Sequence, residues 1–159
     1  MNLKTKKILG YLGVIPFFVF SFLPLLSTFP EGYVFTLLLS FYGAVVLSFL
    51  GGITWGWENA HNHKFSLIIG IFFSLIGFFI ISISNMFLYY SLCLGLVSFL
   101  GFYLFELRVS DQMQDKGYRS LRTLLTFLVT ICYLNSIITF SWEIKLSPNL
   151  SINRETIFV

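Results

Sequence analysis

The segment from Phe65 to Phe105 contains no charged residue. An α-helix rises about 1.5 Å per residue, so a helix of this length is about twice as long as the hydrocarbon core of a bilayer is thick. The segment is therefore predicted to cross a membrane twice. Its most polar stretch, residues 82–85, is where we place the break between two helices that form a tight antiparallel hairpin.

The rest of the chain has the same apolar character. Hydrophobic residues make up 57% of the sequence and charged residues 11%, whereas about a quarter of the residues of a soluble domain are charged. We therefore predict an all-α, polytopic membrane protein in which residues 1–142 form one domain and the polar residues 143–159 form a tail. The five transmembrane helices are expected at about residues 8–27, 33–57, 65–83, 86–105 and 120–142.

The basic residues are divided unequally between the two sides of such a bundle. Of the 10 lysines and arginines, all but Lys145 and Arg154 fall on the side that holds the N-terminus. Basic residues are enriched in the cytoplasmic loops of membrane proteins. The N-terminus is therefore predicted to lie in the cytoplasm and the C-terminus outside.

The second predicted helix carries small residues at helical spacing. Most of them are four positions apart and so fall on one strip of the helix. Small residues let another helix approach closely in a membrane, where lipid is as apolar as the side chains themselves. This helix is predicted to be the packing centre, through Ser40, Ala44, Ser48, Gly51, Gly52 and Gly56.

The third and fourth predicted helices also carry small residues. Those of the third helix are Gly70, Ser74 and Gly77, and the fourth has a similar series. Since these two helices form a hairpin, we expect their small residues to face each other.

A metal site is the weaker of two interpretations for the loop after the second helix. Glu58 and His61 are three positions apart and would share a helix face, the Glu-x-x-His spacing of carboxylate-bridged metal sites, and His63 follows. Such a site needs further carboxylates from other helices, and the apolar segments offer none. A solvated loop is therefore favoured, and no cofactor is expected.

The sequence offers no pattern typical of an enzyme. Glu58, Glu106 and Arg108 all fall at the cytoplasmic ends of predicted helices, and no ionisable residue falls in the middle of one. Proton pumps and ion-coupled transporters commonly retain such a residue at membrane depth. There is also no Gly-x-Ser-x-Gly nucleophile motif and no glycine-rich phosphate loop. We therefore predict that the protein is not an enzyme.

Three basic residues, Lys116, Arg119 and Arg122, lie beside the start of the fifth predicted helix. The simpler interpretation is that they set the topology and contact anionic headgroups, at about 1 kcal/mol per residue. A dedicated docking site for a lipid or a protein is the alternative.

Three segments together resemble a known family: LGYLGVIPF at residues 9–17, YGAVVLSFLGGITWG at 42–56 and YRSLRTLLTFLV at 118–129. They are similar to small bacterial inner-membrane proteins of unassigned function, related to mitochondrial transmembrane protein 69. The resemblance implies a multi-pass fold in the bacterial inner membrane and no particular activity. The family pattern has a histidine, in GGIHWG, where this chain has Thr54, so any role of that histidine is absent here.

These observations favour a non-enzymatic accessory or assembly factor. Its expected partners are the lipid bilayer and a membrane protein or a second copy of the chain, and nucleic acid is not expected. The alternative is a small transporter or lipid-handling protein that acts as an oligomer, which requires a polar cavity beside Thr54, Asn135 and Pro16. The residues that remain open to a functional role are Thr54, Trp55, Glu58, Arg119 and Arg122.

Overall fold

The computed structural model describes residues 3–27, 31–56 and 63–146. Its regular structure is helical, and five helices are long and apolar enough to cross a membrane. The prediction of an all-α chain with five helices of membrane-spanning length is therefore confirmed. The long helices are α1 (Leu3–Phe22), α2 (Glu31–Ile53), α3 (His63–Ser84), α4 (Leu88–Val109) and α5 (Lys116–Leu146).

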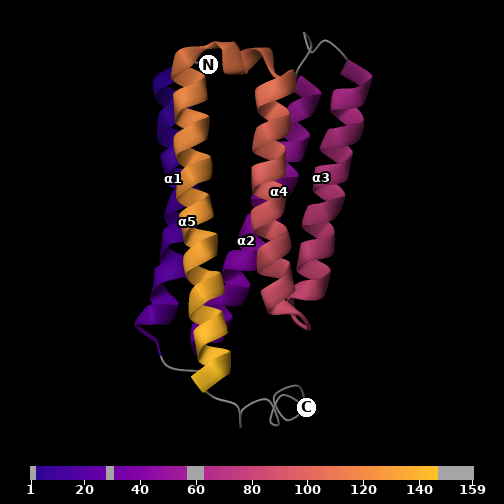
Figure 1. Cartoon of the computed structure of the whole chain (residues 1–159). Coiled ribbons are helices and arrows are strands. Elements are labelled where there is room, and N and C mark those ends of the chain that lie inside the picture. The colour runs from indigo at the N-terminus through magenta and orange to yellow at the C-terminus, as the bar shows by residue number, and fades with distance from the viewer. Residues whose placement is uncertain (1–2, 28–30, 57–62, 147–159) are drawn as a thin grey trace.

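The helices run side by side, and α2 crosses the bundle behind the others (Figure 1). Helix α2 contacts each of the other four helices and packs most extensively against α3. Helix α5 lies between α1 and α4, so the first and last helices of the chain are neighbours. Because α2 contacts α1 and α5 as well as α3 and α4, it can hold these two pairs of helices together.

Aromatic side chains fill the centre of the bundle. The ring of Phe17 lies 5.0 Å from that of Tyr42 and 5.8 Å from that of Phe99, measured between centroids. Tyr133 is fully buried beside them, and its hydroxyl end lies against Gly43 and Gly95. A methyl group at Gly95 would come within 2.8 Å of the Tyr133 hydroxyl, so these two glycines make room for the tyrosine ring.

Several helix ends differ from the sequence prediction, and local hydrogen bonding explains two of these differences. The first helix ends at Phe22 and continues as a 3₁₀ turn, η1 (Leu23–Leu25), because Pro24 has no N–H to extend the α-helical ladder. Helix α5 begins at Lys116, four residues earlier than predicted. The side chain of Asp115 accepts a hydrogen bond from the Gly117 N–H (3.0 Å) and so caps the helix start.

The turn of the α3–α4 hairpin also differs from the prediction. Ser82 and Ser84 remain helical, and each hydroxyl is satisfied within α3 by donating to the carbonyl four residues earlier, Phe78 at 3.0 Å and Ile80 at 2.6 Å. The helices are therefore separated by residues 85–87, not by the serines.

Candidate functional site

The contact between α2 and α3 has room only for very small residues. A Cβ atom added to Gly51 would lie 2.5 Å from the carbonyl oxygen of Gly70, and one added to Gly77 would lie 2.7 Å from the carbonyl oxygen of Ala44. Cβ atoms in real proteins essentially never come closer than 3.0 Å to another heavy atom. The two backbones thus approach each other as closely as glycine permits.

Serine hydroxyls cross the same region of the bundle. The Ser74 hydroxyl donates to the carbonyl oxygen of Ser48 (3.2 Å), which links α3 to α2. The Ser40 hydroxyl lies 2.9 Å from that of Ser84 and 3.1 Å from that of Ser91, so it bonds to α3 and to α4. Hydrogen bonds of this kind between membrane helices contribute on average about 0.6 kcal/mol each.

The small residues of α3 therefore have a different neighbour from the one predicted. Gly70, Ser74 and Gly77 face α2 rather than α4. The spacing of small residues shows which helix face they share, but it does not show which helix covers that face.

Gly52 takes no part in this contact, in contrast to the prediction. It is exposed, and a Cβ atom added there would meet nothing within 4 Å. Successive residues of an α-helix are turned by about 100°, so Gly52 points away from the helix that Gly51 touches. Trp55, which is 60% exposed, is also directed outward, and Gly56 ends the short 3₁₀ helix η2 (Thr54–Gly56).

Thr54 lies inside the α2–α3 contact. Its side chain is fully buried, and its hydroxyl donates to the carbonyl oxygen of Gly51 (2.8 Å). A Cβ atom at Gly70 would collide with the Thr54 hydroxyl. Thr54 is therefore used for helix packing.

The predicted weak metal cluster lies largely outside the described residues. Glu58 and His61 belong to the segment 57–62, and His63 is described only as the first residue of α3. Within the described ranges, no group of three or more histidine, cysteine or acidic side chains could hold a metal ion.

The strongest polar constellation of the described residues joins α4 to α5 near the turn between them. Glu106 is 1% exposed and forms an ion pair with Arg122, whose Nε donates to Oε2 of the carboxylate (2.7 Å). The Tyr118 hydroxyl donates to Oε1 of the same carboxylate (2.9 Å). The Arg122 guanidinium also lies over the ring of Phe102, 5.8 Å from its centroid.

Glu106 was not among the predicted functional residues, because it falls at the cytoplasmic end of a predicted helix. One signal was available: Glu106 and Arg122 have opposite charges and lie near the two ends of the turn that connects consecutive helices. Antiparallel neighbours bring such positions to the same level of the bundle. The side chain of Arg122, which is 14% exposed, is therefore turned inward rather than toward the membrane surface.

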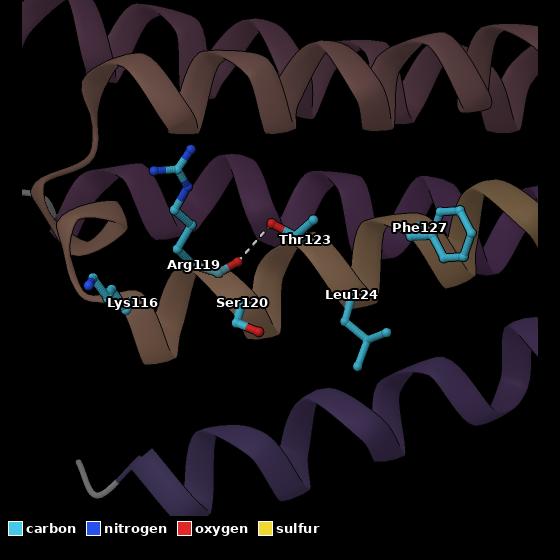
Figure 2. Close-up of a pocket in the computed structure, with 6 residues that line it drawn as sticks. All are labelled: Lys116, Arg119, Ser120, Thr123, Leu124 and Phe127. Carbon is cyan, nitrogen blue, oxygen red and sulfur yellow. Dashed lines mark hydrogen bonds between the residues drawn. The ribbon is translucent and has the colours of Figure 1, made fainter.

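The outer face of α5 begins beside this ion pair and carries a shallow groove of about 520 Å³. Figure 2 shows Lys116 and Arg119 at one end of the groove and Phe127 at the other. Six residues line it, all of them exposed: Lys116, Arg119, Ser120, Thr123, Leu124 and Phe127. Of the basic residues singled out from the sequence, Arg122 thus faces the interior, whereas Arg119 remains on the surface.

The described residues form five apolar helices of spanning length, which small residues and a buried ion pair hold together. These features define the class as a multi-pass helical membrane protein. The chain belongs to a family described as a protein of unknown function, DUF3429, whose model matches residues 3–138. Neither the curated proteins nor the solved structures with which the chain was compared include a significant match.

Proposed function

We propose that the protein is a non-enzymatic accessory or assembly factor that packs against membrane partners. The observation that carries this proposal is the closed arrangement around Glu106. Both of its carboxylate oxygens are hydrogen bonded within the chain, and the group is almost fully buried. Its chemistry is used to hold α4 against α5 rather than to act on a substrate.

Other polar side chains of the interior are used in the same way. The Asn135 amide donates to the carbonyl oxygen of Ser21 (2.9 Å), and the Ser21 hydroxyl donates to the carbonyl oxygen of Cys132 (2.8 Å). These bonds join α1 to α5. The alternative, a transporter or lipid-handling protein, required a polar cavity beside Thr54, Asn135 and Pro16. Thr54 instead packs against Gly70 of α3, and Asn135 donates to Ser21 of α1.

The proposed location is the bacterial inner membrane, with the N-terminus in the cytoplasm and the C-terminus outside. The unequal distribution of lysine and arginine supports this orientation, and the five apolar helices of spanning length support a location in a membrane. The lipid bilayer and a membrane protein or a second copy are the proposed partners, without a cofactor and without nucleic acid.

A topology reporter tests the orientation. Alkaline phosphatase, which is active only outside the cytoplasm, is expected to be active when fused after Val159. The same enzyme fused within the turn that contains η3 (Asp111–Gln114) is expected to be inactive, because that turn lies on the opposite side of the bundle from the end of α5. The reverse pattern of activity would contradict the proposed orientation.

The accessory role predicts a protein partner at the outward face of α2. Phe49 is 68% exposed, and Gly52, one turn further on, leaves a recess because it has no side chain. Another helix can approach closely at such a recess. We expect a photo-crosslinking amino acid at Phe49 to yield one dominant protein adduct in native membranes, identified by mass spectrometry.

Position 138 provides a matched control for this experiment. Ile138 on α5 is similarly exposed, at 67%, but has no neighbouring glycine recess. A crosslinker placed there is expected to give lipid adducts and no dominant protein adduct. If both positions give lipid adducts only, and the purified protein is a monomer without a partner, the outward face of α2 binds no protein. That outcome would contradict the proposed accessory role.

A further inference from the structure

We infer that the outer face of α5 from Lys116 to Phe127 is a binding site for an anionic phospholipid. In this site Lys116 and Arg119 receive the headgroup phosphate, and Leu124 and Phe127 contact an acyl chain. The inference does not depend on the accessory role proposed above, because it concerns a different surface of the molecule.

The residues of this face are arranged in the order that a phospholipid requires. Their positions follow the helical repeat, so they line one side of α5 over about three turns. The basic residues come first, hydroxyl residues follow, and apolar residues end the row (Figure 2). The distance along the helix from Lys116 to Phe127 is about 16 Å at 1.5 Å per residue, which is enough for a headgroup and the upper part of an acyl chain.

The two basic side chains at the head of the groove are available for a ligand. Among the described residues, Arg122 forms an ion pair with Glu106, whereas neither Lys116 nor Arg119 is paired with a described carboxylate. Asp115, the acidic residue closest in sequence, accepts a hydrogen bond from the start of α5. A phosphate would supply the negative charge that this end of the groove lacks.

The hydroxyl groups of the groove have different capacities. The Thr123 hydroxyl donates its proton to the carbonyl oxygen of Arg119 (2.9 Å). It can therefore only accept in its hydrogen bond with the Tyr103 hydroxyl (2.7 Å), and it has no proton left for a ligand. Ser120 has no hydrogen bond to another described residue, and its hydroxyl remains free to donate. Ser120 is therefore the hydroxyl that can add a hydrogen bond to a phosphate or glycerol oxygen.

A lipid fits this surface better than a free phosphate or an acidic protein segment does. A free phosphate would use the basic end and leave the apolar end, with Leu124 and Phe127, without a role. A non-helical protein segment laid along the groove would bring unpaired backbone N–H and C=O groups into the hydrocarbon region, where they have no water partners. A phospholipid has its charge and its apolar part in the order that the groove provides.

Native mass spectrometry of the delipidated full chain in detergent tests the inference, with phosphatidylglycerol and phosphatidylcholine as the probes. The unchanged protein is expected to bind phosphatidylglycerol preferentially. Replacing Lys116 and Arg119 together by glutamine should reduce that preference by roughly 25-fold, about fivefold per basic residue, from about 1 kcal/mol each. Phe127→Ala should weaken the binding of both lipids.

Arg108→Gln is the matched control, since Arg108 is exposed near the same end of α4 but does not line the groove. It should leave the preference unchanged, and all variants should keep the melting temperature of the parent because the altered side chains are exposed. The inference is overturned if R108Q lowers the preference as much as the double variant does, or if the double variant retains it. It is also overturned if glycerol phosphate, which has no acyl chain, competes as well as the lipid.

Discussion

Replacing Glu106 by glutamine is expected to lower the free energy of unfolding by about 3–5 kcal/mol. Glutamine has nearly the same shape and still accepts a hydrogen bond from Tyr118, but it leaves the charge of Arg122 without its partner in a mostly buried position. The cost of an uncompensated buried charge, rather than the loss of one hydrogen bond, sets the size of the effect. Equilibrium unfolding in mixed micelles, followed by circular dichroism, measures it.

Two further variants separate the ion pair from a general effect of charge. Glu31→Gln removes an exposed carboxylate from the start of α2 and should lower stability by no more than about 1 kcal/mol, the usual size of a charge–dipole interaction at a helix start. The double variant with leucine at positions 106 and 122 should be more stable than E106Q, because no unpaired charge remains. Equal losses in E106Q and E31Q would show that the buried pair has no special role in joining α4 to α5.

Two adjacent glycines of α2 are expected to respond in opposite ways to the same substitution. Gly51→Ala should lower the free energy of unfolding by about 1–3 kcal/mol, because the new methyl group meets the backbone carbonyl of Gly70, which cannot move without shifting α3. Gly52→Ala should be neutral or stabilising by up to about 1 kcal/mol, since its methyl group enters open space and alanine favours a helix more than glycine does.

The comparison of these two variants is internally controlled. They differ by one position in the same helix, so differences in expression, detergent or membrane depth are nearly the same for both. The same unfolding measurement decides the outcome. If both variants lose stability equally, Gly52 is covered by something that the bundle does not include, and if neither loses stability, the α2–α3 contact is looser than its geometry indicates.

The number and class of the helices could be predicted from the sequence. Uncharged runs such as Phe65 to Phe105 are long enough to cross a bilayer. Inside it they are expected to be helical, because the hydrocarbon region offers the backbone no hydrogen-bond partners outside the helix itself. The exact helix ends were less predictable. They depend on single hydrogen bonds, such as the one from the Gly117 N–H to the side chain of Asp115.

The sequence also predicted that α2 packs through small residues, but it did not show which of these residues contact another helix. Gly51 and Gly52 have the same side chain and nearly the same place in the pattern, yet one touches α3 and the other faces outward. In the same way, the glycines of α3 were expected to face α4 because the two helices are consecutive. They face α2 instead, since the bundle places a helix there that is earlier in the chain.

By itself, then, the sequence determined that this chain forms five helices long and apolar enough to span a membrane, because the length and apolarity of each run are properties of that run alone. The tertiary structure decided which helix faces meet. It thereby decided which basic side chains at the start of α5 are buried and which are exposed. Arg122 turns inward to a buried Glu106, while Lys116 and Arg119 remain outside. Three basic residues within two turns look equivalent in sequence, and only the position of α4 beside α5 distinguishes them.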